Sequence, residues 1–225
     1  MSAPAPLQFE DLQLTERSPA RLTLAVPPHS TCSMLGDEDS GVDRLASFAL
    51  ALETPPAGRV LVFGEEVGLL GRRPRLAFRR RVGYLPAGDG LLQNLSLRDN
   101  VALPLRFGSD LSDREIEGRL QVALTAARLS RVADVRPAQA NEEQRRRAAL
   151  ARALAFDPEL VILDHPFDGL THRAAAELLE LARGGETAEG SRRTVFVVGQ
   201  DLPEHLRPRI ELTYRVLRGV VEREA

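Results

Sequence analysis

The sequence contains no lysine, so all 30 of its basic residues are arginine. Its single cysteine, Cys32, cannot form a disulfide within the chain, which favours a reducing compartment. No apolar run approaches the roughly 20 residues of a membrane-spanning helix. The first residues also lack the charged and apolar regions of a signal peptide. These absences predict a cytoplasmic protein.

The net charge and the length of the chain further limit its expected partners and its domain organisation. With 32 acidic residues against 30 arginines, the net charge is −2, which gives no reason to expect binding to nucleic acid or to anionic lipid. The 225 residues, of which 43% are hydrophobic, suit one globular domain with a sizeable core and room for an inserted subdomain.

Apolar patterning predicts strands that alternate with helices. Strands are expected over residues 7–14 (at a sheet edge), 22–26, 32–35, 59–64, 160–163 and 194–198, with a closing hairpin over 212–217 and 220–222 that turns at 218–219. Helices are expected over 44–52, 72–81, 110–133, 145–156 and 172–183. This order predicts an α/β layered fold with a mostly helical insertion between about residues 96 and 157.

Residues 36–43 read GDEDSGVD and fit the spacing of a phosphate-binding loop, G-x-x-x-x-G-K-[ST]. Val42 stands where the lysine belongs, and Asp43 stands where the magnesium-binding Ser or Thr belongs. Because the chain has no lysine, no neighbouring residue can restore the motif by a shift of one position. The expected strand before the loop and helix after it are the context that such a loop requires.

The loop is acidic where a phosphate would lie. A lysine contact of this kind contributes about 1.5–3 kcal/mol, whereas like charges a few ångströms apart repel by about 1–4 kcal/mol per pair. Acids at a helix N-terminus are nevertheless stabilising by about 0.3–1 kcal/mol each. We therefore expect the side chain of Asp43 or Asp39 to occupy the anion position, so that the loop is ordered without a nucleotide.

Several segments together resemble the ATPase subunit of ABC transporters. They are residues 55–64, 80–85, 90–101 and 144–154, followed by Asp164 at the end of the apolar run 160–163. The resemblance implies a P-loop NTPase-like core with an antiparallel β part and a helical subdomain insertion. It implies one nucleotide-binding domain over residues 1–225, with a core of about 1–95 and 158–225 and a helical subdomain of about 96–157.

The resemblance also assigns chemical positions, most of which are substituted. Ala87 stands at the Q-loop glutamine, 140–144 at the signature motif, His165 at the catalytic glutamate, Thr171 at the D-loop aspartate and Gln200 at the switch histidine. Residues 15–21 offer no aromatic side chain for adenine. This pattern predicts a degenerate nucleotide site made of Gly36, Ser40, Gly41, Val42, Asp43 and Asp164. It predicts no catalytic residue, no metal site, and ATP with magnesium bound at most weakly.

Purely structural roles for the substituted residues also remain open. His165 is expected to be a surface or packing histidine rather than a base, and Glu142 and Glu143 to be solvated acids at a helix N-terminus. Asp164 is expected either to cap the turn at Pro166 or to accept hydrogen bonds from loop N–H groups.

The predicted function is a catalytically inactive ABC subunit with a structural or regulatory role at a membrane transporter. Residues 101–106 and 147–153 resemble the branch that serves MCE-associated phospholipid transporters, which indicates phospholipid as the cargo. The expected partners are a permease docked near residues 83–106 and a second ABC ATPase subunit, either a copy or an active paralogue, with no nucleic acid. The expected location is cytoplasmic, peripherally associated with the inner face of the membrane.

Two alternatives remain. The chain could be a working transport ATPase in an asymmetric dimer whose partner supplies the lysine and the glutamate. It could also be a soluble interaction module that is detached from any permease.

Overall fold

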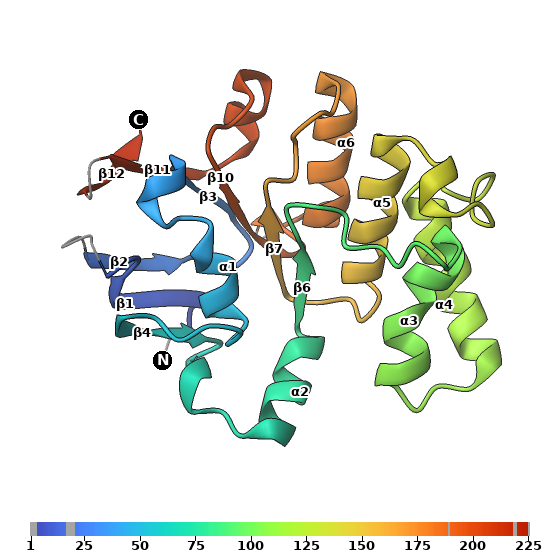
Figure 1. The fold of residues 1–225 in the computed structure, drawn as a ribbon, viewed down its shortest axis with the longest axis horizontal. Coiled ribbons are helices and arrows are strands. Elements are labelled where there is room, and N and C mark those ends of the chain that lie inside the picture. Colours follow the sequence, from blue (N-terminus) through green and yellow to red (C-terminus); the bar gives the residue numbers. More distant parts are fainter. Residues whose placement is uncertain (1–3, 17–20, 189, 218–219, 225) are drawn as a thin grey trace.

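Two β-sheets with flanking helices form the fold in a computed structural model, which describes residues 4–16, 21–188, 190–217 and 220–224. A four-stranded antiparallel sheet has the order β2-β1-β4-β5, and a six-stranded, mainly parallel sheet has the order β12-β11-β3-β10-β7-β6 (Figure 1). The predicted α/β architecture with an antiparallel part is confirmed.

The strands are β1 (Leu7–Gln13), β2 (Arg21–Val26), β3 (Thr31–Gly36), β4 (Ala57–Val62), β5 (Glu65–Glu66), β6 (Val82–Leu85), β7 (Leu160–Asp164), β8 (Glu186–Thr187), β9 (Gly190–Ser191), β10 (Thr194–Gly199), β11 (Leu212–Leu217) and β12 (Val220–Glu224). The α-helices are α1 (Arg44–Ala49), α2 (Arg72–Arg80), α3 (Leu97–Gly108), α4 (Asp113–Ala126), α5 (Glu142–Ala153) and α6 (His172–Arg183). Short 3-10 helices are η1 (Glu38–Ser40), η2 (Val67–Leu69), η3 (Pro137–Gln139) and η4 (Glu204–Arg209).

The central strands β3, β7 and β10 are buried along their whole length. Because side chains alternate along a strand, they supply two separate cores. Leu160 and Ile162 of β7 join the core under α1 and the antiparallel sheet, while Val161 and Leu163 join the core under α3 to α6. Continuous apolar runs are typical of strands covered on both faces, as the sequence indicated.

The helices α3, α4 and α5 gather at one end of the molecule, beyond β6 (Figure 1). The expected helix over 110–133 is too long, because α4 ends at Ala126. There Arg128 adopts a left-handed φ of 58°, and the N–H of Leu129 bonds back to the carbonyl of Leu124 at 2.8 Å. This turn lets the chain reverse towards η3.

Strand β1 was expected at a sheet edge and lies instead between β2 and β4. Its polar residues alternate with buried apolar residues and lie at half-exposed or exposed positions, so its sequence pattern resembles that of an edge strand. The closing hairpin β11–β12 pairs antiparallel as predicted, although its expected turn at 218–219 lies outside the described residues. Among the described residues, no helix combines the length and apolar character needed to cross a membrane.

Candidate functional site

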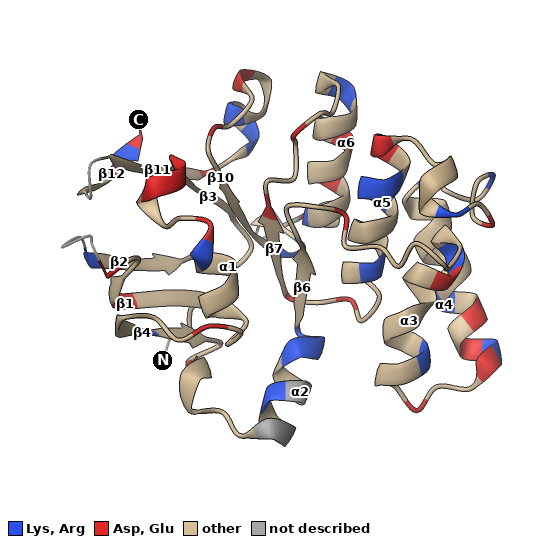
Figure 2. Ribbon diagram, viewed as in Figure 1, with Lys and Arg blue, Asp and Glu red and all other residues tan. Residues whose placement is uncertain are grey.

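The site lies at the carboxyl edge of the six-stranded sheet. The loop after β3, Asp164 at the end of β7 and Gln200 after β10 come together there because these three strands are parallel neighbours. The open edge where parallel strands end is the usual position of ligand sites in α/β sheets. The acidic η1 segment of this loop is drawn red beside β11 in Figure 2.

The nucleotide loop (residues 36–43) is filled by its own side chains. The hydroxyl of Ser40 donates to the carbonyl of Asp37 and accepts from the N–H of Val42 at 3.3 Å. A Cβ atom built on Gly36 would lie 2.4 Å from Ser40 Oγ and 2.8 Å from Val42 Cγ2. Glycine is therefore required at position 36 because Ser40 and Val42 occupy the space above it.

The second glycine of the motif is required for two reasons. Gly41 has a φ of 77°, in the left-handed region that favours glycine. A Cβ atom there would lie 2.5 Å from Cγ2 of Thr15, just beyond β1. The antiparallel sheet thus covers the loop closely. Residues 17–20, which belong to the segment searched for an adenine-stacking aromatic, lie outside the described residues.

The expectation that Asp43 or Asp39 fills the anion position is wrong. Asp43 precedes α1 without a side-chain capping hydrogen bond, and both carboxylates are exposed. The hydroxyl of Ser40 takes the position instead, because a neutral group loses less hydration than a carboxylate when it is enclosed. Val42, at the lysine position of the motif, is only 2% exposed and packs in the apolar core.

Asp164 is the one buried carboxylate at this edge. Its Oδ2 accepts a hydrogen bond from the Tyr84 hydroxyl at 3.1 Å, and its Oδ1 is buried with no partner among the described residues. Burial raises the pKa of Asp164 despite the Tyr84 hydroxyl and a hydrogen bond from the Ala87 backbone, and the charge of Asp43 adds to the increase. Half of the carboxylate therefore remains unsatisfied, and within the described residues no hydrogen bond from the nucleotide loop reaches Oδ1.

A divalent cation fits this arrangement. Magnesium binds through one or two carboxylates together with water and phosphate oxygens, and an unpartnered Oδ1 beside a second carboxylate is a donor set of that kind. Asp164 and Asp43 are the residues that would hold it. The described part of the chain, this site included, holds no group of three or more His, Cys, Asp or Glu side chains that could bind a metal ion by themselves, so water and phosphate oxygens would complete the set.

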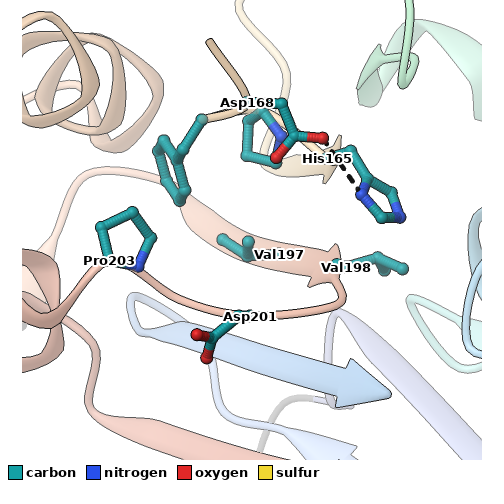
Figure 3. Close-up of a pocket in the computed structure, with 9 residues that line it drawn as sticks. His165, Asp168, Val197, Val198, Asp201 and Pro203 are labelled. Atoms are coloured by element: carbon teal, nitrogen blue, oxygen red, sulfur yellow. Dashed lines mark ion pairs between the residues drawn. The ribbon is translucent and has the colours of Figure 1, made fainter. Parts of the chain in front are cut away.

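His165 lies at the mouth of a pocket rather than in the core. Its backbone N–H donates to the carbonyl of Val198 at 2.8 Å, and the residue adopts a φ of 47°. Its Nδ1 lies 3.4 Å from Oδ2 of Asp168, as the dashed line in Figure 3 shows. The pocket has a volume of about 240 Å³ and is also lined by Asp201 and Pro203. The His165 side chain is 21% exposed and lies beside a carboxylate at the surface, which agrees with the expected surface histidine.

The residue at the switch position reaches the nucleotide loop. Nε2 of Gln200 lies 3.5 Å from Oε1 of Glu38. Arg215 of β11 holds this segment by donating to the carbonyl of Gln200 at 3.1 Å and to Asp201 Oδ1 at 3.2 Å. The loops after β3 and β10 are thus connected through side chains.

The signature position begins α5. Asn141 caps this helix: its Oδ1 accepts from the N–H of Gln144 at 2.8 Å, and Gln144 Oε1 accepts from the N–H of Asn141 at 3.0 Å. Glu142 is exposed, as expected. Glu143 was expected to be solvated and instead pairs with the buried Arg147 at 2.8 Å. The reason is the i,i+4 spacing of the two residues on one helix face.

The docking loop (residues 86–96) is fixed from behind by polar side chains. Arg152 donates to the carbonyl of Gly90 at 2.7 Å, and Arg146 donates to that of Pro86 at 3.3 Å. Asn100 is fully buried and bonds to both the N–H and the carbonyl of Leu92, at 2.7 and 3.1 Å. Sequence reasoning missed Asn100 and Tyr84 as site residues, because their partners are set by strand and helix packing that no motif encodes.

Comparison with known proteins identifies the family. The model of the ABC transporter family matches residues 20–168. A methionine import ATP-binding protein, MetN 2 of Pseudomonas aeruginosa, is 31% identical over 78% of the chain. The chain belongs to the ABC transporter family.

Other similarities agree with this membership. The Nod factor export ATP-binding protein I of Rhizobium sp. is 34% identical over 72% of the chain. The ATP-binding cassette MJ0796, solved as a dimer bound to ADP and Pi, superposes with a TM-score of 0.83 over 97% of both chains at 24% identity, which shows the ABC cassette fold. The chain spans 54% of the length of both named relatives.

Two predictions from the sequence are wrong. The chain was expected to be catalytically inactive and to bind ATP and magnesium at most weakly, whereas it belongs to the ABC transporter family and its relatives MetN 2 and Nod factor export protein I are named as ATP-binding proteins. The expectation relied on substituted side chains at several positions, from Val42 and Asp43 in the loop to His165 and Gln200. Backbone N–H groups and the helix N-terminus supply much of the phosphate contact in such loops, and neither depends on those side chains.

Proposed function

We propose that the chain is the ATP-binding subunit of an ABC transporter and works in an asymmetric dimer with a second ABC ATPase subunit. The observation that carries this proposal is the buried, unpartnered Oδ1 of Asp164, next to the nucleotide loop. A buried carboxylate oxygen without a hydrogen-bond partner lowers the stability of the fold unless a cation binds to it. Magnesium delivered with ATP is the cation that the family uses.

Each residue of the site has a defined task in this proposal. Phosphate displaces the Ser40 hydroxyl and binds the backbone N–H groups of the nucleotide loop, and Asp164 and Asp43 hold magnesium. Bound ATP supplies the phosphoryl group that is transferred to water. The chain itself has no lysine to neutralise the phosphates, so the dimer is asymmetric: the partner's own loop provides the lysine, and the partner provides the catalytic glutamate.

The permease is proposed to dock near residues 83–106, at the inner face of the membrane. The docking loop is held rigidly by Asn100 and Arg152, and its Leu92 is 47% exposed. A rigid loop that presents an apolar side chain suits transmission of movement to another subunit. Residues 1–225 are proposed to form one domain, with a core of about 1–95 and 158–225 and a helical subdomain of about 96–157.

The cargo stays a prediction. The phospholipid role expected from residues 101–106 and 147–153 has no counterpart among the named relatives, which serve methionine import and Nod factor export. No contact in the chain favours one of these cargoes, because cargo is bound by other subunits of a transporter.

ATP turnover by the assembled complex tests the proposal. The chain is expressed with its membrane subunit and its second ATPase subunit, and phosphate release is measured in detergent or in vesicles. Asp164→Asn is expected to lower turnover by at least tenfold, because magnesium loses a ligand. The matched control, Asp110→Asn, removes an exposed carboxylate at the start of α4 and is expected to leave turnover unchanged.

Three outcomes would overturn the proposal, wholly or in part. Equal turnover in the Asp164→Asn and wild-type complexes would show that this site takes no part in the reaction. Failure of the chain to copurify with any membrane protein would favour the detached interaction module. Full turnover by the purified chain alone would instead show that no different ATPase subunit is needed, so the dimer would not be asymmetric.

A further inference from the structure

The distribution of arginine along the chain is strongly uneven. Residues 67–88, called the α2 segment, contain six arginines and no acidic residue. The remaining residues contain 24 arginines and all 32 acids, and therefore carry a net charge of −8. The near-neutral total conceals one basic segment on an acidic protein.

The η2 and α2 part of this segment projects from the body of the molecule, whereas β6, which follows it, lies in the sheet. Helix α2 lies at the amino end of β6, at the edge of the molecule opposite the loops of the nucleotide site, and is drawn largely blue (Figures 1 and 2). Phe78 anchors it in the core with 7% exposure. Leu69, in η2 just before the helix, is 78% exposed. A large apolar side chain thus stands in water beside a basic helix.

Three arginines of α2 are oriented by groups that carry no negative charge. Arg75 donates to the carbonyl of Leu70 at 3.0 Å, and Arg79 donates to the carbonyl of Leu50 at 3.2 Å. The guanidinium of Arg80 lies over the ring of Phe156 at 5.6 Å.

Within the described residues, none of these three arginines forms an ion pair with a carboxylate. Arg81, just after the helix, does pair with Glu159, at 2.7 Å. The orienting contacts of α2 are carbonyl and aromatic groups, which leave its positive charge available to an outside partner.

We infer that the α2 segment binds the anionic headgroups of a lipid bilayer, with Leu69 inserted among them. Basic side chains attract anionic lipid, and a neighbouring apolar side chain gains by leaving water at the interface. Nucleic acid would satisfy the arginines and leave Leu69 exposed, so the lipid surface fits both features.

This inference differs from the sequence analysis, in which the net charge gave no reason to expect binding to anionic lipid. The net charge is a property of the whole chain. Charges are screened beyond about 8–10 Å at physiological ionic strength, so a flat surface that meets α2 responds to the arginines nearby and much less to distant acids.

Sedimentation with vesicles tests the inference on the purified full chain. Binding is compared between vesicles of phosphatidylcholine alone and vesicles that also contain phosphatidylglycerol. The wild-type chain is expected to sediment only with the second kind, and added salt is expected to release it. Arg79→Gln combined with Arg80→Gln is expected to weaken binding by about tenfold or more.

Matched variants control for charge and for hydrophobicity. Arg114→Gln with Arg131→Gln removes the same charge from exposed positions outside α2 and is expected to leave binding unchanged. Leu69→Ala is expected to weaken binding by about fivefold, whereas Val122→Ala, at a side chain that is 70% exposed, is expected to have no effect. If the double variant at 79 and 80 unfolds, Arg80→Gln alone keeps the test valid.

Three results would overturn the inference. The first is equal binding to both kinds of vesicle, or to neither. The second is equal weakening by the 79/80 and 114/131 pairs, which would indicate a response to net charge alone. The third is binding to short duplex DNA that exceeds vesicle binding and is insensitive to Leu69→Ala, which would assign the α2 segment to nucleic acid.

Discussion

The nucleotide loop and the docking loop leave the same edge of the sheet, yet their polar groups are in opposite states. The docking loop is satisfied by buried side chains from behind, chiefly Asn100 and Arg152. At the nucleotide loop, by contrast, four acids lie exposed, and the buried Oδ1 of Asp164 lacks a partner.

This difference shows where each loop gets its stability. The docking loop is ordered by the folded chain itself, so its shape is available to a partner before contact. The nucleotide site keeps one buried group in an unfavourable state that a ligand can relieve. Removing the buried polar group that marks each place, Asn100 behind the docking loop and the Asp164 carboxylate at the nucleotide site, should therefore change the free energy of unfolding with opposite signs.

The largest effect is expected at the docking loop. Asn100→Ala removes a fully buried amide that bonds to both polar groups of Leu92 and to the carbonyl of Ser96. Several buried backbone groups then lose their partners, and we expect the free energy of unfolding to fall by about 3 kcal/mol. Denaturant unfolding monitored by circular dichroism measures this.

The control for that prediction is Asn94→Ala, an exposed amide in the same loop. Its substitution should change stability by less than about 0.5 kcal/mol. If the two variants unfold at the same denaturant concentration, Asn100 does not order the docking loop, and the comparison between the loops fails.

A smaller loss is expected when the missing lysine is restored. Val42→Lys places an ammonium group at a position that is 2% exposed, in space shared with Ser40 and Gly36. The long side chain can reach water in part, so we expect a loss of about 2 kcal/mol without nucleotide. Val42→Met, which adds length without charge, should cost about 1 kcal/mol. Equal unfolding curves for the two variants would mean that position 42 opens to solvent.

Much of the fold could be read from the sequence, because apolar runs and helix signals are local. The run Leu160 to Leu163 predicted a strand buried on both faces, and residues 172–183 matched α6 to the residue. The edge position of β1 was wrong because pairing depends on β4, far away in the chain. The last part of the helix expected over 110–133, residues 127–133, was wrong because the left-handed turn at Arg128 leaves no local signal.

The candidate site was harder to predict than the fold. Motif spacing located the nucleotide loop and Asp164, because glycine and strand signals mark both. It could not show that Ser40 rather than an acid fills the loop, since this depends on the three-dimensional distance to Gly36. Nor could it find Tyr84, whose hydroxyl meets Asp164 only because β6 and β7 pair in parallel. Inactivity was inferred from substituted side chains, whereas much of the phosphate contact in such loops comes from backbone N–H groups, which do not depend on those side chains.

The smallest effect, of opposite sign, is expected at the nucleotide site. Burial raises the pKa of Asp164 in the folded chain above its value in the unfolded chain. The folded state therefore binds more protons, so this residue favours folding below its unfolded pKa and loses that contribution as pH rises through the folded pKa. Asp164→Asn, which cannot ionise, should raise stability by about 1 kcal/mol at neutral pH without magnesium.

The pH dependence separates this prediction from a general repacking effect. The gain of Asp164→Asn over the wild type should shrink as pH falls towards the unfolded pKa, because the wild-type carboxyl then becomes neutral as well. Magnesium should reverse the order of the two proteins by stabilising only the one that retains the carboxylate. Thermal unfolding across pH, with magnesium and with EDTA, measures both. If Asp164→Asn were less stable than the wild type at neutral pH in EDTA, the two loops would respond alike, and the nucleotide site would not hold an unsatisfied charge that awaits a cation.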